Sequence, residues 1–356
     1  MNSFTKKDTS IVKGLAVLML LCHHLGMGIL EPPLDWKNDS FYTIIATLSK
    51  VCVAIFIILS GYGLNESYKK WDRSDFSFVK KHLFKLMKQF WFIYVIFVPL
   101  GFLCGANPIN IYGADFNGFS YFILDFLGLK ALFNTPTMNQ TWWYMETAIV
   151  LYILFPIIKK MLKRFTVITL ILTFIPLIIY SYFCDGSYDN CREIFWFFPF
   201  VCGILFSKYN LFNKFSVLLS RKYFLISILS IILVLVMTAV RSYFGIIVDT
   251  LYAVSIIFFV KATVCRINGV NNVFNYLGIH SANIFMMHSF LYCYYIPIKQ
   301  LLFVVGFAPF NYLFLVLECI VVSDYIEITK KRLISILNKY LSRLHSRKTN
   351  NNINFN

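Results

Sequence analysis

The sequence predicts an all-α integral membrane protein, a polytopic bundle of about ten transmembrane helices with both termini in the cytoplasm. Hydrophobic residues make up 58% of the 356 residues and charged residues only 14%, whereas soluble globular chains carry about 25% charged residues. The mean hydropathy of the whole chain is +0.67. This composition leaves no room for a sizeable soluble domain, and it excludes disordered, collagen-like and disulfide-scaffold proteins.

The individual spans are predicted from runs of apolar residues, because a transmembrane helix needs about 20 of them. Ten runs qualify, at residues 11–30, 44–64, 86–104, 141–158, 164–183, 192–207, 222–241, 245–264, 278–298 and 301–326. The run Phe119–Phe133 is shorter and interrupted. Two alternatives stay open for it: a re-entrant or interfacial helix, or an eleventh span that would invert the orientation of everything after it.

The basic residues predict the orientation of these spans. With ten spans and the N-terminus inside, 27 of the 33 Lys and Arg residues fall in cytoplasmic segments, and such an excess marks the cytoplasmic side. The net charge of +16 is therefore spread over short clusters between apolar runs. Since it forms no single basic stripe, we expect the lipid bilayer, and no nucleic acid, as its partner.

The chain divides into a transmembrane domain, residues 1–328, and a basic tail, residues 329–356. In the tail, leucines share one helical face and Lys and Arg share the other; the leucines are Leu333, Leu337, Leu341 and Leu344. This pattern predicts an amphipathic helix on the inner membrane surface. The Asn-rich end, Thr349–Asn356, is expected to be disordered.

Cysteine spacing gives no sign of a metal site. The nine cysteines include no C-x-x-C pair, so neither a zinc site nor a redox motif is predicted. Cys184 and Cys191 flank a predicted outer loop. They could form a disulfide in an oxidising compartment; two unpaired cysteines is the alternative.

Ionisable side chains inside the spans are the main candidates for function, because they are costly in a bilayer. Lys13 and His24 are the most informative pair. They lie three helical turns apart on nearly the same face, about 16 Å along the axis. Lys13 at the inner mouth could hold the phosphate of a carrier molecule. His24 in the outer half could then receive the group that this carrier delivers. The alternative is a topological lysine and a histidine that only packs.

Two neighbours of His24 are expected to play different parts. His23 points about 100° away from His24 on a helix, which favours helix packing. Glu146 opens the fourth span at the depth of His24, where a carboxylate could orient an imidazole and stabilise its cation. The alternative for Glu146 is an interfacial carboxylate paired with a lysine.

Four segments, in this order along the chain, resemble motifs of the membrane-bound acyltransferase 3 family. Lys13–His24 resembles the family's first span, in which an Arg stands at the place of Lys13 and a His at that of His24. Val53–Tyr62 ends in the Leu-Ser-Gly-Tyr of the second-span signature. Thr141–Pro156 and Leu277–His288 are similar to the family's Trp–Glu–Pro segment and its late Leu-Gly…His segment.

The resemblance implies a multi-pass protein of the bacterial cell (plasma or inner) membrane, which transfers an acyl group from cytoplasmic acyl-CoA to a hydroxyl of an envelope glycan. His24 matches the family's essential histidine. The sequence departs from the family at Lys80–Lys88, where His82 and Lys85 replace a pair of arginines. Positive charge survives there, but lysine lacks the bidentate grip of arginine on phosphate.

These observations lead to one functional hypothesis, an O-acyltransferase that moves acetyl from acetyl-CoA to an envelope polysaccharide or its lipid-linked precursor. In this hypothesis His24 is a general base or forms a transient acyl-imidazole, and Glu146 orients it. The donor-binding residues are Lys13, His82, Lys85, Lys88, Ser60 and Tyr62. The acceptor-side residues are Trp142, Trp143 and His288. No metal and no bound cofactor are expected, and a polysaccharide exporter is the rival function.

Overall fold

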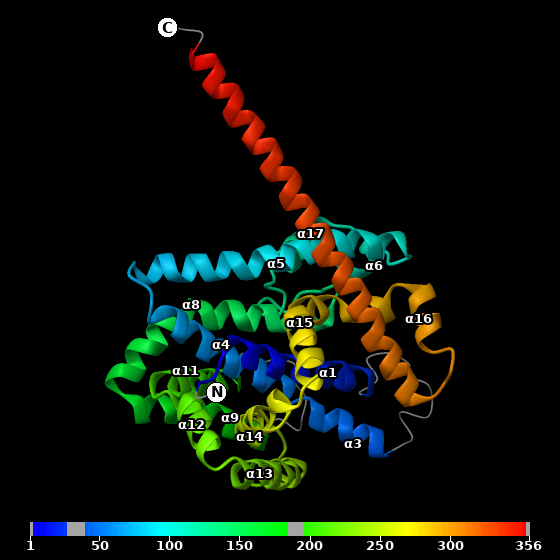
Figure 1. Ribbon diagram of the computed structural model, residues 1–356. Helices are drawn as coiled ribbons and strands as arrows, with labels where there is room; N and C mark the ends of the chain where they lie inside the picture. The colour runs from blue at the N-terminus through cyan, green and yellow to red at the C-terminus, as the bar shows by residue number, and fades with distance from the viewer. Residues whose placement is uncertain (1–2, 27–39, 184–194, 354–356) are drawn as a thin grey trace.

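The computed structural model describes residues 3–26, 40–183 and 195–353, and within these ranges the chain forms helices and no strands. Its α-helices are α1 (Lys6–Gly26), α3 (Ser40–Ser49), α4 (Cys52–Tyr68), α5 (Asp75–Leu103), α6 (Pro108–Tyr112), α7 (Phe116–Phe126), α8 (Trp143–Arg164), α9 (Thr166–Phe183), α11 (Phe197–Lys208), α12 (Leu211–Arg221), α13 (Tyr223–Phe244), α14 (Asp249–Ala262), α15 (Val270–Cys293), α16 (Ile296–Leu302) and α17 (Ala308–Ile353). Figure 1 shows them stacked as one bundle, with α1 and α4 near its centre.

The helices have the length and composition of a membrane protein. Four described stretches are long and apolar enough to cross a bilayer: Lys6–Gly26, Phe41–Tyr68, Asp75–Leu103 and Tyr223–Arg266. Shorter apolar helices cover Thr166–Ile179 and Phe197–Lys208. The all-α membrane class is thereby supported, while the number of ten spans and the cytoplasmic termini stay predictions.

The run Phe119–Phe133 forms a short helix followed by turns. Helix α7 has 11 residues, which rise about 16 Å, against a hydrocarbon core of about 30 Å. Asp125 on this helix is buried and accepts hydrogen bonds from the hydroxyls of Tyr112 (2.6 Å) and Thr137 (2.7 Å). The structure therefore favours the non-spanning alternative for this run.

The centre of the bundle depends on two helix pairs that cross through glycines. A Cβ on Gly278 of α15 would overlap the backbone carbonyl of Ser10 on α1, and one on Gly14 of α1 would overlap the carbonyl of Phe274. Gly61 of α4 and Gly203 of α11 meet the backbones of the opposite helices in the same way. Small residues let membrane helices approach this closely.

Helix α17 differs from its expected division into a span and a separate surface helix. It runs unbroken from Ala308 to Ile353, and its C-terminal half extends beyond the rest of the bundle (Figure 1). The chain has no Gly or Pro there to end a helix. At the predicted boundary, Lys330 Nζ donates to Gln89 Oε1 of α5 (2.8 Å) and to Glu327 Oε1 (2.9 Å), which holds the helix against the bundle.

We expect Gly278→Ala to lower the melting temperature of the purified protein by several degrees, because the added methyl group pushes α1 away from α15. Gly63→Ala is the matched control. No atom lies within 4 Å of a Cβ at Gly63, and alanine is the better helix former, so its melting temperature should stay equal or rise. Equal melting temperatures for the two variants would show that the α1–α15 crossing is not tightly packed.

Candidate functional site

Three cavities follow one another along α4. The vestibule, about 1090 Å³ in volume, is lined by Lys70, Glu66 and Tyr62 near the end of this helix. The narrow cavity, about 150 Å³, is lined by Ser60 and Phe56 one turn earlier. The outer cavity, about 200 Å³, is lined by Ala54 and Val53 at the start of the helix. Helix α1 follows the same line, because Lys13 lines the first two cavities and His24 the third.

The vestibule carries an excess of positive charge. Its basic lining residues are Lys6, Lys13, Lys70, Arg73 and Lys81, and its acidic ones are Glu66 and Asp72. Lys81 Nζ lies 4.7 Å from the centroid of the Trp71 ring, which also lines the vestibule. A wide, cationic recess of this kind attracts a multiply charged anion.

The predicted donor residues are only partly at this vestibule. Lys13 and Tyr62 line it. His82 lies behind it, with its Nε2 3.2 Å from the hydroxyl of the lining residue Ser67. Lys85 and Lys88 are exposed on α5 and outside its lining.

Two of the basic residues that line the vestibule, Lys70 and Arg73, come from the turn between α4 and α5. In the sequence, both residues contribute only to the charge bias that predicts orientation. The one local signal for more than that was Trp71, an aromatic residue between two basic ones.

The narrow cavity is walled by aromatic and small residues. Tyr144 and Tyr152 of α8, Ser281 of α15 and Ser60 line it together with Lys13. The hydroxyl of Ser60 donates to the carbonyl of Phe56 in its own helix (2.8 Å), as a packing residue does, and it is not activated by any base in the described chain. The narrow cavity is large enough for an extended chain but too small for a bulky charged group.

Phe285 separates the narrow cavity from the outer one. Its ring lies 4.8 Å from that of Tyr144 and 6.4 Å from that of His288, centroid to centroid. Trp143, the residue before Tyr144, lines the outer cavity. The two cavities are thus one layer of side chains apart.

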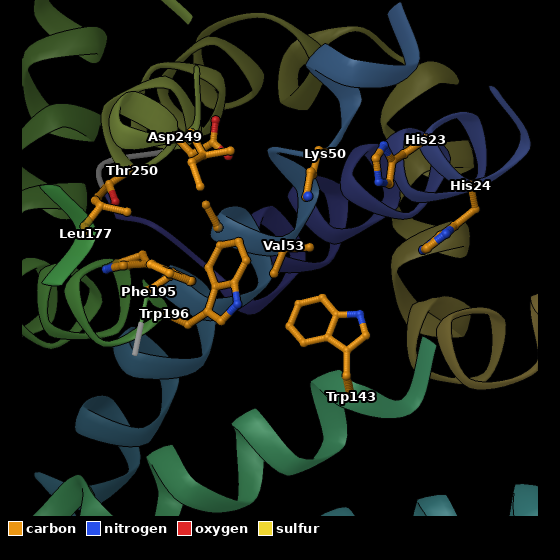
Figure 2. Close-up of a pocket in the computed structure, with 13 residues that line it drawn as sticks. His23, His24, Lys50, Val53, Trp143, Leu177, Phe195, Trp196, Asp249 and Thr250 are labelled. Atoms are coloured by element: carbon orange, nitrogen blue, oxygen red, sulfur yellow. The ribbon is translucent and has the colours of Figure 1, made fainter. Parts of the chain in front are cut away.

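The outer cavity brings imidazoles, indoles and charged groups together. Figure 2 shows His23 and His24 on one side and Trp196, Asp249 and Thr250 on the other, with Trp143 between them. The rings of Trp143 and Trp196 are stacked, 5.9 Å apart with an interplanar angle of 24°. Asp249 Oδ1 accepts from Arg241 Nε at 2.9 Å in a buried ion pair.

His24 is adjacent to His288 of α15, with ring centroids 5.0 Å apart. The Nδ1 of His288 lies 2.9 Å from the carbonyl oxygen of Phe285 and 3.1 Å from that of Ile284. Because carbonyls only accept hydrogen bonds, Nδ1 carries the proton and Nε2 is an acceptor. Nε2 of His288 and Nδ1 of His24 are buried, and neither has a hydrogen-bond partner among the described residues.

His23 and Glu146 are each fixed by a backbone group. His23 Nδ1 is bonded to the carbonyl of Ala46 on α3 (2.8 Å), which is the packing contact expected for it, and its ring also borders the outer cavity. Glu146 is fully buried, and its Oε2 accepts from the backbone amide of Ala131 (2.6 Å). This hydrogen bond joins Glu146 to the loop before α8, and the ring beside that of His24 is His288.

Of the two tryptophans predicted for the acceptor side, Trp143 lines the outer cavity and Trp142 does not. The Trp142 side chain is 1% exposed, and its Nε1 donates to the carbonyl of Met286 (2.9 Å). Its ring packs edge-on against Phe90, 5.0 Å away. Consecutive residues at the start of a helix point in different directions, and this pair divides into one core residue and one cavity residue.

Two expectations about cysteines and metals have different outcomes. Cys184 and Cys191 lie outside the described residues. Among the residues that the structure does describe, no three His, Cys, Asp or Glu side chains are grouped closely enough to hold a metal ion.

The fold and the cavities define a class of protein: a helical membrane protein in which buried imidazoles lie in line with a cationic vestibule. A family model described as an acyltransferase domain, acyltransferase 3, matches residues 9–328. The chain therefore belongs to the acyltransferase 3 family and is a membrane acyltransferase. Neither a curated protein nor a solved structure matches it.

Proposed function

We propose that this acyltransferase transfers acetyl from acetyl-CoA to a hydroxyl of an envelope polysaccharide or of its lipid-linked precursor, in a bacterial cell membrane. The observation that carries the proposal is the order of the cavities along α1 and α4. A cationic vestibule with Lys13 stands at one end, and His24 stands at the other. A donor with a charged head and a thin, neutral arm matches this order.

The vestibule would take the phosphates of CoA. Charged groups are costly to bury, so they stay where water and lysines surround them. The pantetheine arm would enter the narrow cavity, whose wall includes Phe56 and Tyr144. The rise of about 16 Å from Lys13 to His24 along the helix then sets the reach that the arm needs.

His24 would act as the general base, with His288 as its positioning residue. The Nε2 of His288 is an acceptor beside the unpartnered Nδ1 of His24. A small rotation of either ring would let Nδ1–H of His24 donate to it, which leaves Nε2 of His24 free to accept a proton. Glu146, bonded to Ala131, would hold the adjoining loop instead of the imidazole.

The transfer step follows from this arrangement. The acceptor hydroxyl loses its proton to His24 while its oxygen bonds to the thioester carbon. The carbon–sulfur bond then breaks, and His24 returns the proton to the sulfur of CoA. Sugar rings stack on indoles, and the stacked Trp143 and Trp196 of the outer cavity suit an acceptor of this kind.

His24→Gln should reduce acetyl transfer by about 10²-fold or more, because glutamine keeps a hydrogen bond but cannot accept the proton. His23→Gln should retain most activity, because that ring is bonded to the α3 backbone. The measurement is release of CoA thiol from acetyl-CoA by membranes, with an envelope extract of the deletion strain as acceptor. Near-normal turnover by His24→Gln would contradict the role of His24, and no acceptor-dependent release by the wild type would favour an exporter.

Replacing Lys81 and Arg73 together by Gln should raise the KM for acetyl-CoA about tenfold at low salt, with a smaller effect at higher salt, because salt screens the attraction that these two charges provide. The matched control replaces Lys85 and Lys88 by Gln. It removes the same charge from the same end of the bundle but outside the vestibule lining, so the KM should change much less. Equal KM values for the two double variants would mean that overall charge, and not the vestibule, attracts the donor.

A further inference from the structure

A second basic cavity, separate from the vestibule, lies where α4, α8 and α11 end. This lysine cavity has a volume of about 400 Å³, and its charged lining residues are Lys69, Lys159, Lys160, Lys163, Lys208 and Asp75. Lys69 belongs to it and the next residue, Lys70, to the vestibule. The two cavities therefore lie at the same end of the bundle, on different sides of α4.

Nearby carboxylates neutralise only part of its charge. Lys160 Nζ lies 3.0 Å from Asp75 Oδ2, and Lys69 Nζ lies 2.6 Å from Glu66 Oε1. Two further lysines of the lining contact neutral groups. Lys159 Nζ lies 3.4 Å above the ring centroid of Tyr68, and Lys208 Nζ donates to the carbonyl of Leu162 (2.9 Å). The cavity thus keeps a net positive charge.

Apolar groups adjoin these lysines. Pro156, Leu162 and Ile204 complete the lining. On the outer surface of α8, Ile153 and Ile157 are 49% and 55% exposed, and they lie on one stripe of the helix that continues to Lys160. The site therefore combines a cationic head with an apolar stripe on the bilayer-facing side of the bundle.

We propose that the lysine cavity binds an anionic phospholipid, with the phosphate among Lys159, Lys163 and Lys208 and an acyl chain along Ile153 and Ile157. Basic pockets between membrane helices recognise anionic headgroups in this way. A soluble phosphate compound would satisfy the lysines but leave the apolar stripe uncovered. The general bias of lysines toward the cytoplasmic side accounts for their number, but not for their convergence on one cavity from three helices.

A phospholipid bound in the lysine cavity would make the stability of the fold depend on lipid. A ligand that binds only the folded state stabilises it by mass action. A phospholipid here would join the ends of α4, α8 and α11, and α4 and α8 also form the walls of the narrow cavity. The lipid would act without entering the path between Lys13 and His24.

The test uses the full-length protein, purified in an uncharged detergent, with its melting temperature measured after adding dioleoyl phosphatidylglycerol or zwitterionic dioleoyl phosphatidylcholine. Phosphatidylglycerol should raise the wild-type melting temperature by several degrees more than phosphatidylcholine does. Lys159→Gln with Lys163→Gln should lose most of this difference. Lys214→Gln with Lys222→Gln, the same charge loss at exposed sites within α12 and directly after it, should keep it.

Three results would overturn the proposal. The first is a full phosphatidylglycerol effect in the Lys159/Lys163 variant. The second is an equal shift with millimolar glycerol 3-phosphate, which would make the occupant a soluble phosphate. The third is loss of stabilisation by acetyl-CoA in that variant, which would assign the cavity to the donor. If the variant is too unstable without lipid for a melting curve, the phosphatidylglycerol bound to it is measured by native mass spectrometry. Binding to the variant as strong as to the wild type would equally overturn the proposal.

Discussion

The close crossing of α1 and α15 is the constraint on which the rest of the site depends. Gly14 and Gly278 let the two backbones meet with no side chain between them. Only at this distance can His24 on α1 stand beside His288 on α15, with ring centroids 5.0 Å apart. The same approach brings Ser281 next to Lys13 in the wall of the narrow cavity. A larger residue at either glycine would push the two helices apart. It would thereby separate the imidazoles without contacting them.

The polarity of the cavities is what the proposed use of a charged donor by a buried base requires. A bilayer interior penalises each charge by several kcal/mol, so the phosphates of the proposed donor would remain at the basic vestibule. Beyond Lys13 the lining of the narrow cavity is mostly aromatic and small, and its polar side chains are hydroxyls. Nδ1 of His24 and Nε2 of His288 have no hydrogen-bond partner among the described residues, and a buried polar group without a partner costs stability.

The sequence predicts what depends on one helix and misses what depends on contacts between helices. Local spacing alone predicts the shared face of Lys13 and His24 and the packing contact of His23. The pairing of His24 with His288 does not, because it joins residues far apart in the chain. Spacing also could not separate Trp142, a core residue, from Trp143, a cavity residue. The vestibule is lined by Lys70, Arg73 and Lys81 and not by Lys85 and Lys88. This difference depends on how the turn after α4 folds, which spacing does not predict.

The central claim is that the acetyl group travels along α1 and α4 while the phosphates stay behind. A structure of the protein bound to a non-hydrolysable acetyl-CoA analogue tests it most directly. We expect the phosphates beside Lys70, Arg73 and Lys81, the pantetheine arm in the narrow cavity, and the acetyl carbon in the outer cavity near Nε2 of His24, close to the reactive separation of about 3.5 Å. An analogue whose acetyl end stays on the vestibule side of Lys13, or which occupies the lysine cavity, would contradict this path.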